Sequence, residues 1–192
     1  NIILLGYSMG GNITLKYLGE TTNIPSEIKG AIAVSVPCDL KGSSYALATW
    51  NNYMYMNRFL KTLKKKTIIK LNKFPKNGVD KSTVLKATSF EDFDNAVTAP
   101  LFGYKNAEDY WKKCSSKQFI PAISKPTLLI NALDDSFLSE SCFPVKEAKN
   151  HQYLNFEIPK YGGHVGFNSS IFGKDLLWSE KRIFDYIKHV IN

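Results

Sequence analysis

The sequence predicts an α/β fold with a mostly parallel sheet, because short, mostly apolar segments alternate with helical patterns along the chain. Strands that are buried on both faces lack the polar alternation of exposed sheets, and residues 1–5, 30–36 and 126–132 lack it too. The chain has 192 residues, 44% of them hydrophobic and 22% charged, so it can bury one core, and disorder, collagen and coiled coil are excluded. No apolar run approaches the roughly 18–20 residues that a membrane-spanning helix requires.

The strands and helices can be assigned from these patterns. Four apolar segments are predicted to be strands: residues 1–5, 30–36, 126–132 and 153–158. A helix is expected over 12–18, ending at Gly19, and another over 178–190. The second helix has an apolar face, which we expect to pack on the sheet. Its members are Ile183, Phe184, Ile187 and Val190.

The segment from Lys41 to about Ile120 interrupts the strand–helix alternation. It is rich in lysine and aromatic residues, and a helical pattern runs through residues 53–63. A structureless loop of that length is uncommon in a compact domain. We therefore predict a helical cap over 41–120, inserted into an α/β core that residues 1–40 and 121–192 form.

The net charge of +8 belongs to the inserted segment. Residues 41–86 contain ten Lys and one Arg but a single acidic residue, Asp80, a balance of +10. The rest of the chain has 14 basic and 16 acidic residues, a balance of −2. The charge therefore describes one segment and not the whole protein.

The strongest chemical signal is the segment 6–11 (GYSMGG), which contains G-x-S-x-G between an apolar strand and a helix. Such a turn lifts a serine hydroxyl above the end of the sheet, and small flanking residues let the backbone make the turn. The start of the helix supplies amides, including that of Met9, where an oxyanion would form. Ser8 is therefore the predicted nucleophile, and the alternative is a glycine-rich turn with an incidental serine.

A serine hydroxyl needs a base, and the chain offers three histidines. His189 lies in the last predicted helix, where a surface or capping role is simplest. His151 lies in a polar loop before a strand. His164 follows a strand and lies in the glycine-rich loop 161–167 (YGGHVGF), which allows a close approach to Ser8. We predict His164 as the base, with a structural histidine in a tight turn as the alternative.

An acid that orients the imidazole should follow the strand before the one that carries the histidine. Asp134 and Asp135 both do so, in the segment 131–137 (NALDDSF). Adjacent residues leave a strand end in different directions, so one of the two is expected to reach His164. We favour Asp135, and we expect Asp134 to fix the turn through bonds from its side chain to the backbone.

These motifs resemble the α/β-hydrolase superfamily, and within it the YheT-like branch that also contains the ABHD1/2/3-type lipid hydrolases. The resemblance rests on GYSMGGN at 6–12, SVPCDL at 35–40, FDNAVTAPLFGY at 93–104, NALDDSF at 131–137 and GGHVGF at 162–167. It implies a serine carboxylester hydrolase for small-molecule acyl or lipid-like esters, with Ser8 as nucleophile, His164 as base and Asp135 as acid. Ser136 stands where the branch usually has proline. An acyltransferase, or a hydrolase-like scaffold without activity, would carry the same three residues.

The position of the serine turn departs from this resemblance. In the α/β-hydrolase fold the turn normally follows the fifth strand, whereas here it begins at residue 6. The loop that normally supplies the second oxyanion-hole amide is absent from these residues. We therefore expect the N-terminal half of the sheet to be missing, residues 1–5 to form an unpaired apolar edge, and the chain alone to be impaired. Monomeric, fully active protein made of residues 1–192 would contradict this expectation.

No cofactor or metal is predicted. The histidines and the three cysteines lack metal-ligand spacing, and an odd number of cysteines favours reduced thiols in a reducing compartment. Cys38 is a poor rival nucleophile, because it follows a Val-Pro step without a glycine-rich turn or a nearby base. These features favour a cytoplasmic location, with peripheral attachment to a membrane left open.

The basic stretch over 58–76 allows three interpretations. The favoured one is a cap helix whose lysines lie in water and whose apolar residues cover the active site. The second is binding to an anionic membrane surface, since basic and apolar residues are interleaved along the stretch. Nucleic acid is the least favoured partner, because a single Arg there offers little bidentate recognition of phosphates or bases.

Overall fold

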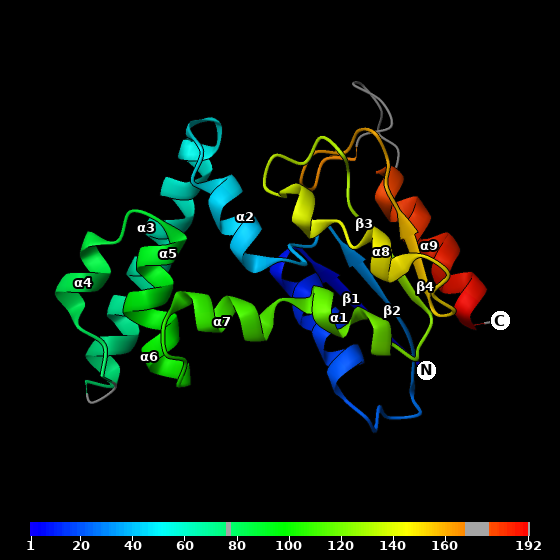
Figure 1. Cartoon of the computed structure of the whole chain (residues 1–192), viewed down its shortest axis with the longest axis horizontal. Helices are drawn as coiled ribbons and strands as arrows, with labels where there is room; N and C mark the ends of the chain where they lie inside the picture. The colour runs from blue at the N-terminus through cyan, green and yellow to red at the C-terminus, as the bar shows by residue number, and fades with distance from the viewer. Residues whose placement is uncertain (76–77, 168–176, 192) are drawn as a thin grey trace. The chain divides into compact units, whose positions relative to one another are not determined.

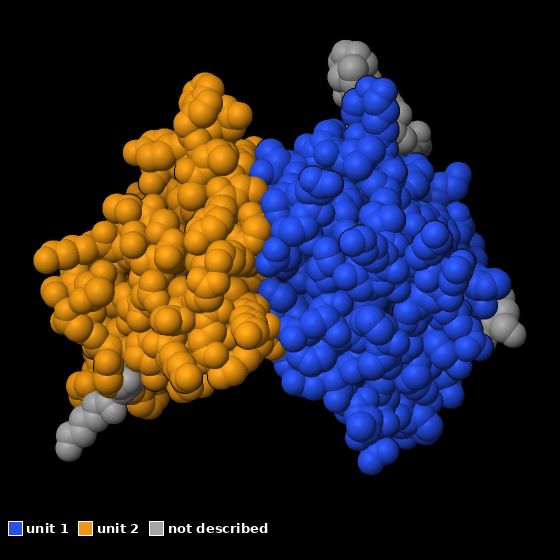
Figure 2. Space-filling model, in the orientation of Figure 1, with its two compact units in different colours: residues 1–39, 115–192 blue, residues 40–114 orange. Residues whose placement is uncertain are grey.

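The computed structural model describes residues 1–75, 78–167 and 177–191 and divides the chain into two compact units (Figures 1 and 2). Unit 1 comprises Asn1–Asp39 and Ser115–Asn192, and unit 2 comprises Leu40–Cys114. Unit 1 holds every strand that the structure describes, and the regular elements of unit 2 are helical.

Unit 1 is built on a four-stranded sheet in the order β1-β2-β3-β4. The strands are β1 (Ile2–Tyr7), β2 (Ile28–Val34), β3 (Thr127–Ile130) and β4 (Leu154–Glu157). Each neighbouring pair runs parallel. The predicted parallel sheet is therefore confirmed, and the carboxyl ends of all four strands meet at one edge.

Helices cover both faces of this sheet, which explains why β1, β2 and β3 are mostly apolar, whereas β4 at the end of the strand order contains Asn155 and Glu157. Helix α1 (Met9–Glu20) packs on one face and helix α9 (Trp178–Ile191) on the other (Figure 1). The first face contains Ala31, Ala33 and Leu129 with Leu15 and Leu18 of α1. The second contains Ile32, Val34, Leu128 and Ile130 with Ile183 and Tyr186 of α9. The remaining helical segments of unit 1 are η3 (Ser116–Ala122), η4 (Glu140–Cys142) and α8 (Val145–Ala148).

The predicted apolar face of α9 is wrong at one position, Phe184. Ile183 is 5% exposed, and Ile187 and Val190 pack against the same cluster, but Phe184 is 53% exposed. Successive residues of an α-helix lie about 100° apart around its axis. The side chain of Phe184 therefore points away from the apolar stripe to which Ile183 belongs. Tyr186 takes its place in the contact with the sheet.

The apolar edge that was expected at residues 1–5 corresponds to β1. Within the described ranges β1 pairs with β2 alone and stands at one end of the strand order. The side chains of Ile2 and Leu5 in β1 are about half exposed. Apolar side chains therefore lie in solvent along this edge of unit 1.

Unit 2 is an assembly of helices. They are α2 (Leu40–Leu47), η1 (Trp50–Asn52), α3 (Tyr53–Lys73), α4 (Lys81–Lys86), α5 (Phe90–Phe93), η2 (Asp94–Thr98), α6 (Ala99–Phe102) and α7 (Ala107–Cys114). A buried carboxylate links two of them, since Trp111 Nε1 donates to Asp94 Oδ2 at 2.8 Å and Thr98 Oγ1 donates to Asp94 Oδ1 at 2.6 Å. Burial raises the pKa of the Asp94 carboxyl, and these two bonds oppose the rise.

The whole net charge of the chain resides in unit 2. Leu40–Cys114 carries 14 basic and six acidic residues, a balance of +8, whereas unit 1 carries 11 of each. Helix α3 buries one stripe, made by Met56, Leu60, Thr67 and Leu71. The cations Arg58, Lys61 and Lys65 lie on its exposed side. A neutral α/β unit is thus joined to a basic helical one.

Candidate active site

Ser8 lies at the sharp turn between β1 and α1. Its backbone has φ 52° and ψ −121°, a left-handed conformation that is costly for any residue except glycine. Its N–H donates to Val34 O at 2.8 Å, and Asn12 N donates to Ser8 O at 3.1 Å, so the serine is tied to β2 and to the first turn of the helix. The turn places the Ser8 hydroxyl at the carboxyl edge of the sheet.

Two glycines allow strand and helix to approach each other at this turn. A Cβ on Gly6 would lie 2.4 Å from the carbonyl oxygen of Gly10, and a Cβ on Gly11 would lie 2.5 Å from Val36 Cγ2. Real Cβ atoms do not come that close to other atoms. The small residues that the sequence places around Ser8 therefore serve the geometry of the turn.

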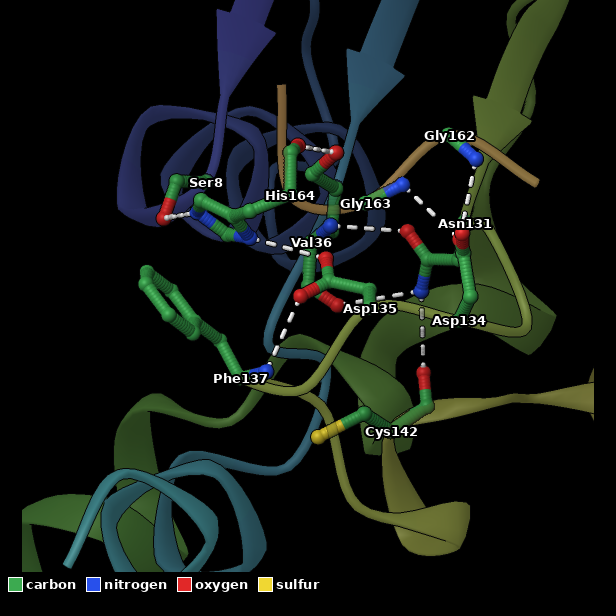
Figure 3. A network of polar contacts seen from close by, with 11 residues as sticks. Ser8, Val36, Asn131, Asp134, Asp135, Phe137, Cys142, Gly162, Gly163 and His164 are labelled. Atoms are coloured by element: carbon green, nitrogen blue, oxygen red, sulfur yellow. Dashed lines mark hydrogen bonds and ion pairs between the residues drawn. The ribbon is translucent and has the colours of Figure 1, made fainter. Parts of the chain in front are cut away.

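The three residues that we predicted as a catalytic triad lie together in unit 1 (Figure 3). His164 Nε2 is 2.9 Å from Ser8 Oγ, and His164 Nδ1 is 2.8 Å from Asp135 Oδ2. The Asp135 side chain is completely buried, whereas that of His164 is 17% exposed. Serine, aspartate and histidine follow β1, β3 and β4, so the parallel sheet brings together residues that are far apart in sequence.

The two adjacent aspartates point in different directions (Figure 3). Asp135 Oδ1 accepts a hydrogen bond from Phe137 N at 3.0 Å, which leaves Oδ2 for the imidazole. Asp134 Oδ1 accepts from the amides of Gly162 and Gly163 at 2.9 and 2.8 Å. The side-chain-to-backbone bonds expected of Asp134 are thus present, but they hold the histidine loop and not the turn of Asp134 itself.

Three residues around His164 were not identified from the sequence. The Phe137 ring lies 4.4 Å from the imidazole, centroid to centroid, and is buried. Asn131 Oδ1 accepts from Val36 N at 2.7 Å, and its Nδ2 donates to the carbonyls of Val36 and Cys142, which ties the aspartate loop to the end of β2. The Ser35 hydroxyl donates to the carbonyl oxygen of His164. Ser35 and Asn131 directly follow β2 and β3, which is their one signal in the sequence, and Phe137 has no such signal.

Met9 is the first residue of α1, directly after Ser8, and is partly exposed. An amide in the first turn of a helix has no acceptor within that helix. The N–H of Met9 can therefore donate to an oxygen of a bound molecule next to Ser8 Oγ.

The rival candidates occupy structural positions. His151 Nδ1 accepts from the amides of Tyr153 and Leu154, so its proton lies on Nε2, which donates to Ile120 O at 3.0 Å. His189 lies in the last turn of α9. Cys38 is fully buried, and burial raises the pKa of its thiol, which disfavours the nucleophilic thiolate.

Two features are absent from the described parts of the chain. No group of three or more His, Cys, Asp or Glu side chains there could hold a metal ion. None of the helices there has both the length and the apolar character to cross a membrane.

Comparison with known sequences identifies related proteins. The family model described as alpha/beta hydrolase fold matches residues 1–165. The Escherichia coli (strain K12) protein YheT, which is named as an esterase, is 31% identical over 185 residues that cover 95% of this chain and 54% of YheT. Mouse phospholipase ABHD3 is 27% identical over 97% of this chain and 45% of its own. A monoacylglycerol lipase of Saccharomyces cerevisiae is 33% identical over 85% of this chain and 37% of its own.

Solved structures show the same fold. An esterase of Pyrococcus furiosus matches with a TM-score of 0.53 and 15% identity, over 98% of this chain and 54% of the esterase. An acylaminoacyl peptidase matches with a TM-score of 0.55 and 18% identity, over 97% of this chain and 23% of the peptidase. The chain spans about half the length of the curated relatives it matches, or less.

Proposed function

The chain belongs to the α/β hydrolase fold family, and we propose that it cleaves carboxylic esters through Ser8, His164 and Asp135. The observation that carries the proposal is the continuous series of hydrogen bonds from Ser8 Oγ through the His164 ring to Asp135. Esterases and lipases among its relatives support the reaction class.

In the proposed mechanism His164 Nε2 removes the proton of Ser8 Oγ while that oxygen attacks the ester carbonyl carbon. Asp135 keeps the other ring proton on Nδ1 and stabilises the imidazolium. The N–H of Met9 donates to the developing oxyanion. The imidazolium then protonates the leaving alcohol, and an acyl-Ser8 intermediate remains. Water, deprotonated by His164, releases the acid and restores the serine.

The proposed substrates are small-molecule acyl or lipid-like esters. The related proteins that carry substrate names are a phospholipase and monoacylglycerol lipases. Their shared chemistry is a carboxylic ester of a fatty acyl chain. The series Ser8–His164–Asp135 requires nothing of the substrate beyond an accessible acyl carbonyl, so the acyl ester is the feature that we carry over to this chain.

Labelling with a fluorophosphonate probe tests the nucleophile. In the natural full-length chain we expect one label per protein on Ser8, and no label in Ser8→Ala, because the probe phosphonylates an activated serine. Ser26→Ala, which alters an exposed serine of the same unit, serves as the control and should label like the wild type. Intact mass and peptide mapping give the site. Folded protein without label, or label that persists in Ser8→Ala, would refute the proposal.

We also propose that unit 2 binds anionic membrane surfaces through residues 58–76. Two observations favour this binding: the entire charge of +8 lies in unit 2, and α3 presents cations on its exposed side. Exposed apolar side chains precede them, with Trp50 at 85% and Met54 at 82% exposure. Lysines supply attraction to anionic headgroups, and such apolar side chains can enter the interface.

Vesicle sedimentation tests this binding with phosphatidylcholine alone and with added phosphatidylserine. We expect binding to the anionic vesicles at low salt and its loss at moderate salt. Replacing Lys61, Lys65 and Lys66 together by Gln should weaken binding about 10²-fold, at about 1 kcal/mol for each lysine. The control replaces three exposed lysines of unit 1, namely Lys29, Lys146 and Lys149. No binding at low salt, or equal loss in both triple variants, would contradict the proposal.

A further inference from the structure

The main chain around His164 is held by two side chains that lie outside the proposed triad. The amides of Gly162 and Gly163, just before the histidine, donate to Asp134 Oδ1 at 2.9 and 2.8 Å. The carbonyl oxygen of His164 itself accepts from the Ser35 hydroxyl. The loop is thus bonded on both sides of the residue whose ring must face Ser8.

Ser35 is placed for this contact at some cost to the backbone. It follows β2, is completely buried, and has φ 55°, a region that favours glycine. Its N–H donates to Ile130 O at 2.7 Å, which fixes it to the end of β3. A glycine would adopt this conformation more readily, but it would lack the hydroxyl that reaches His164.

Asp134 connects the histidine loop to the turn that carries Asp135. Two adjacent residues of this turn therefore contact the histidine loop. Asp135 Oδ2 is hydrogen-bonded to Nδ1 of the His164 ring, and Asp134 Oδ1 accepts hydrogen bonds from the backbone just before His164. Within the loop, the amides of Gly166 and Phe167 donate to Gly162 O at 3.0 and 2.9 Å, and Gly163 has φ 55°. The bonds from Ser35 and Asp134 add to these internal bonds and tie the loop to the ends of neighbouring strands.

We propose that Ser35 and Asp134 are positioning residues that keep His164 Nε2 in reach of Ser8 Oγ. The inference rests on the proposed function, in which the present separation of 2.9 Å allows proton transfer. A misplacement of about 1 Å in such a site can lower the rate about 10²-fold. Neither residue contacts the reacting atoms, so both act through the histidine.

The rate constant for fluorophosphonate labelling tests the proposal, because it depends on the geometry of His164 and Ser8 in each folded molecule. The final number of labels per protein counts the molecules that are folded. We expect Ser35→Ala and Asp134→Ala to lower the rate constant by about 10- to 10²-fold while the final label stays near one per chain. With an ester substrate, kcat should fall and KM should stay nearly constant.

Conservative variants separate bonding from backbone effects. Ser35→Gly suits φ 55° better than alanine does, yet it should be as slow as Ser35→Ala, because both lack the hydroxyl. Asp134→Asn keeps an oxygen acceptor and should regain most of the rate that Asp134→Ala loses. Thr127→Val is the matched control: it also removes a buried hydroxyl that donates to a carbonyl, that of Lys125, but at the amino end of β3.

The possible results distinguish this inference from the proposed function. If the wild type labels at Ser8 while Ser35→Ala and Asp134→Ala label at the wild-type rate, the positioning role is wrong and the nucleophile stands. A reduced final label with an unchanged rate constant, or equal slowing by Thr127→Val, would assign the two residues to stability alone and would also overturn the inference. If the wild type does not label, the proposed function itself fails.

Discussion

Asp135→Asn is expected to lower kcat for ester hydrolysis by about 10⁴-fold with little change in KM, because the variant favours the wrong tautomer of His164. Phe137 N needs an acceptor at the position of Oδ1, so the amide oxygen of the new asparagine would occupy that site. Its NH₂ group would then face Nδ1, which must accept a hydrogen bond and move its proton to Nε2. A protonated Nε2 cannot take the proton of Ser8.

The neighbouring variant Asp134→Asn makes the identical chemical change one residue away. Its amide oxygen can still accept from Gly162 and Gly163, and Asp134 is exposed, so we expect kcat within about tenfold of the wild type. Steady-state kinetics on both variants, with circular dichroism as a check of folding, decides between the two aspartates that the sequence left open. Equal effects, or a larger effect at Asp134, would contradict the assignment of Asp135.

The predictable part of the fold and site rested on local signals. Mostly apolar segments marked the strands because helices cover both faces of the sheet. Glycines around Ser8 marked the sharp turn, where a Cβ on Gly6 would meet the backbone of Gly10 and a Cβ on Gly11 would meet the Val36 side chain. The order in which polar residues follow the strands then brought Ser8, Asp135 and His164 to one edge, since parallel strands share the edge at which they end.

Residues whose role is a contact between distant segments could not be found in this way. Ser35 reaches a carbonyl 129 positions further along the chain, and Asn131 bonds Val36 across 95 positions. Neither forms a local pattern, because the contact depends on where two strands end side by side. The prediction for Phe184 was wrong for a different reason. An apolar residue in an amphipathic helix is assigned to the buried stripe from its type, but the side chain of Phe184 is exposed.

Gly6→Ala is expected to destabilise the protein by about 3 kcal/mol, because the new methyl group would lie 2.4 Å from the Gly10 carbonyl oxygen. That atom belongs to the backbone of α1, so no change of rotamer relieves the clash and the strand must move away from the helix. Thermal unfolding followed by circular dichroism should show a melting temperature lower by about 10 °C.

Gly10→Ala is the matched control for this prediction. A Cβ at Gly10 meets nothing within 4 Å, and alanine favours an α-helix over glycine by about 0.5–1 kcal/mol, so this variant should be as stable as the wild type or more so. Equal melting temperatures for the two variants would refute the close approach of β1 and α1 at the turn. The close approach of β1 and α1 also determines the position of Ser8 relative to His164. The Gly6→Ala molecules that remain folded should therefore react more slowly with a fluorophosphonate than Gly10→Ala does.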